Sequence, residues 1–140
     1  MRRDLSELTN DELEKVLDRW FSHFIRLRYS DDNGYVHCVT CGRLKFWREG
    51  HCGHYSKRNK AHRYNEHNCH FQCVYCNTYM SGEADKHADF IDRKYGEGTA
   101  KMLRGTENKT NKLTSNDYLH LINIYKNKAK QEAKKRGLEI

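Results

Sequence analysis

The sequence predicts an α+β domain whose small core is supported by zinc. Apolar residues recur at helical spacing near both ends of the chain, whereas the middle carries two Cys-x-x-Cys pairs within strand-like and turn-rich sequence. A chain of 140 residues buries only a modest hydrophobic core, and a bound metal compensates for that. We therefore expect a single domain over 1–140, with a helix on each side of a metal-binding centre.

The first element is a helix predicted over 9–28. Thr9 and Glu12 have the spacing of a capping box, in which each side chain accepts a hydrogen bond from the other residue's backbone amide. The apolar residues that follow keep the three-and-four spacing of an amphipathic helix: Leu13, Val16, Leu17, Trp20, Phe21, Phe24 and Ile25. We expect this face to be part of the core.

The central segment, 35–96, begins after a turn. Asn33-Gly34 favours positive φ, and the strand-like residues that follow it lead into the first cysteine pair. A short strand is expected to return from this pair near 44–47. The next strand should lie at 50–55, where two histidines occur close together.

Two further helices are predicted toward the C-terminus. The first occupies 81–95 and ends at Gly96, and the second occupies 113–136, with a capped start. The stretch from 99 to 112 is only weakly patterned. The last helix is rich in Lys and Arg at its end, and such a run either lies along DNA or stays solvated.

The cysteine spacing predicts a structural zinc site. Two thiolates spaced two residues apart share one face of a tetrahedral Zn²⁺, and a second pair completes a closed four-sulfur site from Cys38, Cys41, Cys73 and Cys76. Three disulfides are the alternative, which a reducing compartment disfavours. Cys52 and Cys69 lie outside the pairs and are expected to pack as small buried residues.

The composition favours a polyanionic partner. Lys and Arg number 26 against 19 acidic residues, so the net charge is +7 and the pI about 9.1. Nucleic acid is the default candidate, although charge alone is equally compatible with a merely soluble basic protein. No apolar run approaches the ~18 residues of a membrane span, and the amino terminus resembles no secretory signal, so a cytoplasmic location is expected.

Three polar residues around the cysteine pairs suggest hydrolytic chemistry. Phosphodiester hydrolysis needs a base for water, a metal to offset phosphate charge and a group that orients the base. His54 at a strand end has an unperturbed pKa near working pH. Asn68 precedes the second cysteine pair and Asn77 follows it, so both lie where a compact hairpin-and-helix site would use them.

With these residues the sequence resembles the HNH, or His-Me finger, nucleases, and more narrowly the NinG/Rap family of phage recombination proteins. The resemblance covers roughly 35–96 and rests on an ordered set of motifs. These are Gly53-His54-Tyr55, the run from Arg63 to His70, Gln72-Cys73, Cys76-Asn77, Ser81-Gly82 and Tyr95-Gly96. It implies a zinc-stapled ββα-metal (His-Me finger) core flanked by N- and C-terminal helices.

The resemblance also implies an activity and roles for single residues. His54 becomes the general base, Asn68 the residue that orients or supports it, and Asn77 a ligand of a catalytic Mg²⁺ or Mn²⁺. The family's activity is metal-dependent cleavage of branched DNA, such as Holliday junctions and displacement loops. The expected protein is thus a phage or prophage endonuclease in the cytoplasm of a bacterial host, and a homodimer is left open.

One departure from the superfamily pattern concerns the residue before the base. Many HNH enzymes have Asp or His there as a metal ligand, whereas this chain has Gly53. His51 shares a strand face with position 53, so it is the first candidate substitute, followed by His70 and then His67. The alternatives are that these histidines bind nothing, or that His51, His54, His67 and His70 form a second zinc site.

The segment after the predicted base is basic. Lys57, Arg58, Lys60 and Arg63 are candidates for phosphate contacts, and ordinary solvated loop charges are the alternative. Two rival functions share parts of the pattern. A non-catalytic zinc-ribbon module that binds DNA or RNA would need no His54, whereas an HNH nuclease of ordinary duplex would differ only in its substrate.

Overall fold

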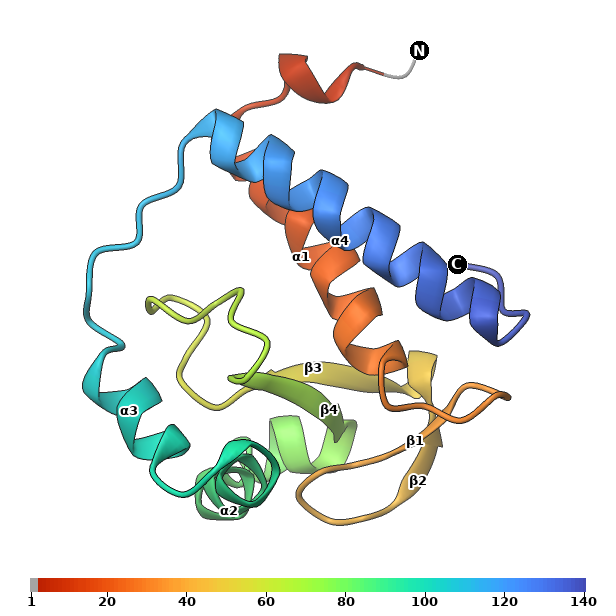
Figure 1. Cartoon of the computed structure of the whole chain (residues 1–140), viewed down its shortest axis with the longest axis vertical. Helices are drawn as coiled ribbons and strands as arrows, with labels where there is room; N and C mark the ends of the chain where they lie inside the picture. The colour runs from red at the N-terminus through yellow and green to blue at the C-terminus, as the bar shows by residue number, and fades with distance from the viewer. Residues whose placement is uncertain (1–2) are drawn as a thin grey trace.

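The computed structural model describes residues 3–140, which form an α+β fold of helices and two small antiparallel hairpins (Figure 1). The first two residues of the predicted 1–140 domain lie outside the described part. One hairpin carries the first cysteine pair, and the other separates a long helix pair from two shorter helices. No helix within residues 3–140 is both long and apolar enough to cross a lipid bilayer.

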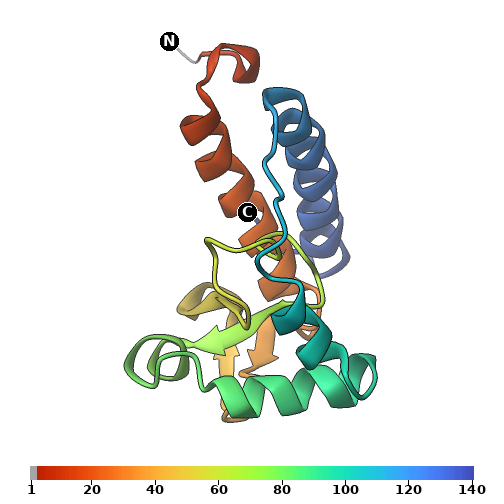
Figure 2. The same cartoon turned by 90° about the vertical axis from the view of Figure 1, so that its left-hand side faces the viewer.

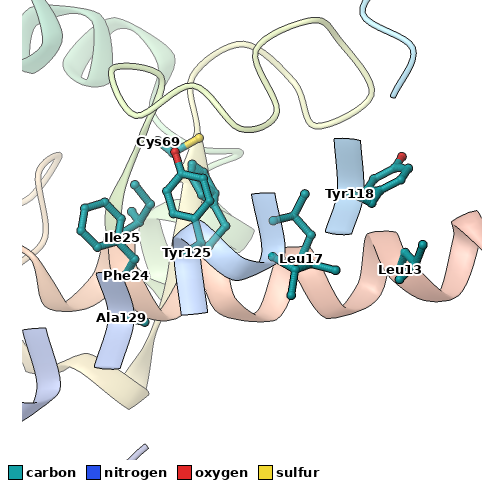
Figure 3. Close-up of a cluster of buried hydrophobic side chains, with 10 residues drawn as sticks. Leu13, Leu17, Phe24, Ile25, Cys69, Tyr118, Tyr125 and Ala129 are labelled. Carbon is teal, nitrogen blue, oxygen red and sulfur yellow. The ribbon is translucent and has the colours of Figure 1, made fainter. Parts of the chain in front are cut away.

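The long helix pair consists of α1, Asn10–Leu27, and α4, Ser115–Lys135, which lie side by side in both views (Figures 1 and 2). A short 3₁₀ turn, η1, precedes them at Leu5–Glu7. The predicted capping box of Thr9 and Glu12 is confirmed, and Thr114 with Asp117 forms a second one at the start of α4. Apolar side chains from both helices fill the core between them (Figure 3).

The first hairpin pairs β1, Tyr35–His37, with β2, Leu44–Phe46. The turn before β1 requires glycine, because Gly34 has φ of +86° and an added Cβ would lie 2.9 Å from the Phe46 ring. A 3₁₀ turn, η2, Trp47–Glu49, then leads into the second hairpin and buries the Trp47 side chain completely.

The second hairpin pairs β3, Gly50–His54, with β4, Cys69–Cys73. His54 lies opposite Cys69 and Gly53 opposite His70, so alternate residues point to opposite faces of the hairpin. One face packs against α1, and the other packs against the helix that follows (Figure 2). The loop between the strands, 55–68, lies beside α1 through ion pairs to Asp18.

The remaining helices differ in part from the sequence prediction. A π-helical turn, η3, occupies Tyr75–Tyr79, and α2 occupies Ala84–Tyr95 and ends at Gly96 as expected. α2 begins three residues later than predicted because Ser81 and Glu83 adopt positive φ values of 53° and 49°. The weakly patterned stretch also contains a helix, α3, Thr99–Gly105, whose few apolar residues pack against α2.

Candidate functional site

The four cysteines of the two Cys-x-x-Cys pairs form a cluster that could hold a zinc ion. Their sulfur atoms all lie within 4.8 Å of one another, and the Sγ atoms of Cys41 and Cys73 are 3.7 Å apart. The first pair follows β1, and the second spans the end of β4 and the start of η3. All six cysteines are free thiols, so the disulfide alternative is not supported.

The surroundings of Cys38 favour a thiolate. Burial raises the pKa of this thiol, but hydrogen bonds from the Thr40 hydroxyl and from backbone amides outweigh it and lower the pKa to about 6. The Thr40 hydroxyl lies 3.3 Å from the Cys38 sulfur and is buried with it. A thiolate near neutral pH is the form that binds zinc, so the donor atoms fit this metal.

An open cleft of about 620 Å³ lies beside β3, between α1 and η3. His51, Cys52 and His54 reach it from β3, while Asn77 and Thr78 reach it from η3. α1 and the 55–68 loop complete its walls. A smaller hollow at the same edge joins His54 and Asn77 to the loop residues Lys57 and Arg58. The predicted base and the predicted metal ligand therefore lie on one surface.

His54 is held in one orientation by the backbone of the loop. Its Nε2 donates a hydrogen bond to the carbonyl oxygen of Arg63 over 2.9 Å. Burial lowers the pKa of the His54 ring, and the bond to the Arg63 carbonyl opposes this only in part. The ring is therefore neutral near pH 7, with its remaining lone pair on Nδ1.

Asn68 fixes the loop rather than facing the cleft. Its side chain is completely buried, and its Oδ1 accepts a hydrogen bond of 2.7 Å from the Ser56 amide. Its Nδ2 donates to the carbonyl oxygens of Ser56 and His62 at 2.9 and 3.1 Å. The loop that begins just after His54 is thus closed by one amide side chain. This placement suits a residue that positions His54 without touching a substrate.

His51 and Asn77 contact each other. The Asn77 Nδ2 lies 3.0 Å from the Nδ1 of His51, and both residues line the cleft. His51 points to the opposite side of β3 from His54, but the strand is narrow and its free edge exposes both residues to the same cleft. The substitution of His51 for the usual ligand before the base stays a prediction with a compatible geometry.

His70, the second candidate metal ligand, lies away from the cleft. It is 1% exposed, its Nδ1 lies 2.9 Å from His87 Nε2, and its Nε2 lies 2.7 Å from the Tyr95 hydroxyl. It lines neither the cleft nor the smaller hollow, because it faces α2. The second zinc site considered for His51, His54, His67 and His70 is likewise absent among residues 3–140, where these four side chains form no common cluster.

The four predicted phosphate contacts separate into two pairs. Lys57 and Arg58 are exposed and flank the hollow that contains His54 and Asn77. Arg63 instead binds Asp18 through two hydrogen bonds of 3.0 and 2.5 Å and lies 3.5 Å from Glu14. Lys60 donates to Asn108 over 2.9 Å. The second pair therefore anchors the loop. Arg58 also donates to Asp18 over 3.0 Å, but its side chain stays 61% exposed, so Lys57 and Arg58 remain the candidates for phosphate contacts.

Comparison with models of known protein families shows which family this chain belongs to. The sequence model of the family described as Bacteriophage Lambda NinG protein matches residues 2–136. The chain belongs to the NinG family. Membership in this phage family suggests a recombination-related role. No curated protein and no solved structure matches the chain.

Packing explains why this NinG family member has glycine at position 53, where many HNH enzymes have a metal ligand. A Cβ at this position would lie 1.9 Å from Oε1 and 2.6 Å from Cδ of Gln72. The Gln72 side chain lies across the strand and donates to the Thr40 hydroxyl and the Gly82 carbonyl at 3.1 and 2.8 Å. A larger ligand therefore has no room at position 53 while Gln72 occupies it.

Two residues near the NinG site were missed by the sequence analysis. Asp18 lies on α1 and receives hydrogen bonds from Arg58, Arg63 and Tyr64, which fixes the loop beside the cleft. No sequence pattern marked it, since its partners are far away in the chain. His87 is buried behind His70, and its spacing of four residues from Ile91 on one face of α2 was a usable signal.

Proposed function

We propose that the protein is a metal-dependent endonuclease of the HNH type that cuts branched DNA in phage recombination, in the cytoplasm of the bacterial host. The observation that carries this proposal is the convergence of His54 and Asn77 on one open surface, flanked by Lys57 and Arg58. A base, a metal ligand and phosphate-binding cations within one hollow are the groups that hydrolysis of a phosphodiester requires.

His54 is the general base in this proposal. Its Nε2–H bond to the Arg63 carbonyl leaves Nδ1 as the nitrogen that can take a proton from water. A neutral ring at working pH is needed for this step, and burial keeps His54 neutral. Asn68 acts through the loop, since it fixes the backbone that in turn holds His54.

Asn77 and His51 are the residues that would hold the catalytic ion. The contact joins Asn77 Nδ2 to His51 Nδ1, so an ion would displace this hydrogen bond and take the Asn77 amide oxygen and the imidazole nitrogen as ligands. This small ligand set fits an ion that takes its other ligands from water and a DNA phosphate. Mn²⁺ accepts such a mixed set more readily than Mg²⁺, which prefers oxygen. The bound ion would offset negative charge on the scissile phosphate and on the leaving oxygen.

Exposed aromatic side chains on η3, which borders the cleft, support a preference for branched DNA. η3 carries Asn77 and also exposes two aromatic rings, Tyr75 and Tyr79, which are 53% and 75% accessible. Exposed rings stack on unpaired bases, and each stacked base contributes on the order of 1–3 kcal/mol to binding. Unpaired or distorted bases occur at a branch point and not within intact duplex, so these rings would favour junctions.

The experiment compares the purified protein with its His54→Ala variant. Both are incubated with linear duplex, single-stranded DNA, a displacement loop and a four-way junction, in Mn²⁺, Mg²⁺ or EDTA, and binding and cleavage are scored separately. We expect metal-dependent cleavage that falls by roughly 10²–10⁴-fold in His54→Ala while binding persists. His120→Ala, an exposed histidine on α4, is the matched control and should cut normally.

The other outcomes assign the rival functions. Binding without cleavage under every metal would refute the nuclease and support the zinc-ribbon module. Equal cleavage of duplex and junction would assign an HNH nuclease of ordinary duplex. The Tyr79→Ala variant tests the branch preference separately, because it should reduce affinity for junctions by several-fold more than affinity for duplex.

A further inference from the structure

A second group of metal-binding side chains lies on the face of the β3–β4 hairpin that packs against α1. Cys52 and His54 occupy this face of β3, and Cys69 lies directly opposite His54 on β4. The sulfur and nitrogen donors of the three residues all lie within 4.8 Å of one another. This is the same proximity that unites the four cysteines of the Cys-x-x-Cys pairs.

The two faces of this group differ in access. Cys69 is completely buried against the aromatic and aliphatic side chains of α1 and α4, beside Tyr125 (Figure 3). Cys52 and His54 are partly exposed and line the open cleft. The group therefore has a closed inner side and an open outer side, from which an ion and a water molecule can enter.

We propose that Cys52, His54 and Cys69 form a second, open metal site for a thiophilic ion of the Zn²⁺ class. Two thiolates and one imidazole are donors that zinc and cobalt prefer and that Mg²⁺ does not. Three protein ligands leave the fourth tetrahedral position to water from the cleft. On binding, two metal–sulfur bonds and one metal–nitrogen bond would form, the hydrated ion would release the water molecules that they replace, and the two thiol protons would pass to solvent.

The backbone already holds two of the three ligands side by side. The Arg63 carbonyl oxygen accepts the hydrogen bond from His54 Nε2 at 2.9 Å and also lies 3.6 Å from the Cys69 sulfur. Burial alone explains Cys69 as a packed residue, but it does not explain a partly exposed Cys52 thiol and the His54 imidazole at the same point. Ion binding accounts for all three.

The site would regulate the proposed nuclease, and this consequence rests on the proposed function. A neutral imidazole has one lone pair, so a His54 ring that gives it to a metal has none left to accept a proton from water. A thiophilic ion in this site would thus block the base while Mn²⁺ or Mg²⁺ bound elsewhere in the cleft. The predicted effect is inhibition of cleavage by micromolar zinc.

Metal stoichiometry tests the site without reference to activity. Protein with one equivalent of zinc is titrated with Co²⁺, and the cobalt–thiolate absorption is followed with total metal measured by atomic absorption. We expect one further equivalent with thiolate absorption, lost in Cys52→Ala and weakened at least tenfold in affinity in His54→Ala. His51→Ala, which changes the neighbouring histidine that contacts Asn77, is the control that keeps it. Circular dichroism verifies that each variant is folded.

The outcomes separate the two proposals. A single equivalent of metal in the parent protein, or a second equivalent that survives Cys52→Ala, would overturn the site. Inhibition is tested by measuring the cleavage rate of each protein with and without added zinc. Zinc should slow cleavage by the parent protein, whereas the rates of Cys52→Ala with and without zinc should be nearly equal. Normal cobalt binding in a protein that never cuts DNA would uphold the site and reject only the nuclease.

Discussion

Among the described side chains of the 55–68 loop, Asn68 is the one that hydrogen-bonds to the backbone of both Ser56 and His62. Its amide joins the backbone of Ser56 to that of His62 inside the protein. Replacing it with alanine leaves those buried backbone groups unpaired, so we expect Asn68→Ala to lower the free energy of unfolding by about 3 kcal/mol. Urea denaturation provides the measurement. Asn59→Ala, in the exposed part of the same loop, is the control and should change it by less than about 0.5 kcal/mol.

Cleavage by Asn68→Ala distinguishes positioning from chemistry. If Asn68 acts only through the loop, the variant should lose activity together with order in 55–68, and the pH profile of the remaining activity should stay that of His54. A fully stable Asn68→Ala protein would contradict the role assigned to these hydrogen bonds.

Several buried histidines make stability depend on pH, among them His23 and His87. Burial lowers the pKa of both His23 and His87 from 6.5 to about 4, with nearby positive charges adding to the effect. The unfolded chain therefore binds these protons at a pH where the folded protein does not, so stability should fall as pH decreases from about 6.5 to about 4. Each histidine contributes a slope of up to about 1.4 kcal/mol per pH unit.

Unfolding free energies of the parent and of His87→Gln across this range provide the measurement. Glutamine retains hydrogen-bonding capacity toward His70 but does not titrate, so the slope should become shallower in the variant. Zinc thiolates that protonate at low pH affect both proteins equally. Identical slopes would show that His87 does not remain neutral in the folded state.

At the scale of elements, the β3–β4 hairpin packs closely around two glycines of β3, Gly50 against Phe71 and Gly53 against Gln72. Gly53 faces Gln72 so closely that Gly53→Ala must displace a buried side chain, and we expect a loss of about 2 kcal/mol of stability. The same substitution in a Gln72→Ala background should cost much less, because the displaced side chain is gone. A double-mutant cycle by urea denaturation measures this coupling. Additive effects would show that the two residues do not conflict.

Element boundaries were predictable where a local signal dominated. The capping boxes and the long apolar periodicity located α1 and α4 to within a residue or two, because these signals lie within the helix itself. The start of α2 was shifted by two residues with positive φ, and α3 was missed. α3 is short, and its few apolar residues become a core only through contact with α2.

At the scale of the whole molecule, the four-cysteine cluster connects elements that are distant in the chain. Cys38, Cys73 and Cys76 pack in one buried group with Leu27 at the end of α1 and Ala133 near the end of α4. We expect a zinc ion to hold this cluster together, so its removal would leave four thiols that nothing links. Structural zinc sites contribute several kcal/mol or more to folding, so the metal-free protein should melt at least about 10 °C lower.

Thermal unfolding followed by circular dichroism, before and after chelation, checks this expectation. Restoring zinc should restore the midpoint, and Cys41→Ser, which changes the most exposed of the four ligands, should resemble the chelated protein. An unchanged midpoint in protein verified to be free of metal would show that the apolar core alone is sufficient.

The sequence by itself determined the α+β class, the two cysteine pairs that could hold zinc, and the family. All three follow from residue type and spacing, and a Cys-x-x-Cys pair indicates metal binding even without a structure. Only the tertiary structure decided which histidines meet. Cross-strand register placed Cys69 opposite His54, which shares a strand face with Cys52, and turned His70 toward α2. The 55–68 loop folded so that Arg63 pairs with Asp18. Such contacts join residues that no local pattern connects, because they depend on strand pairing and helix packing.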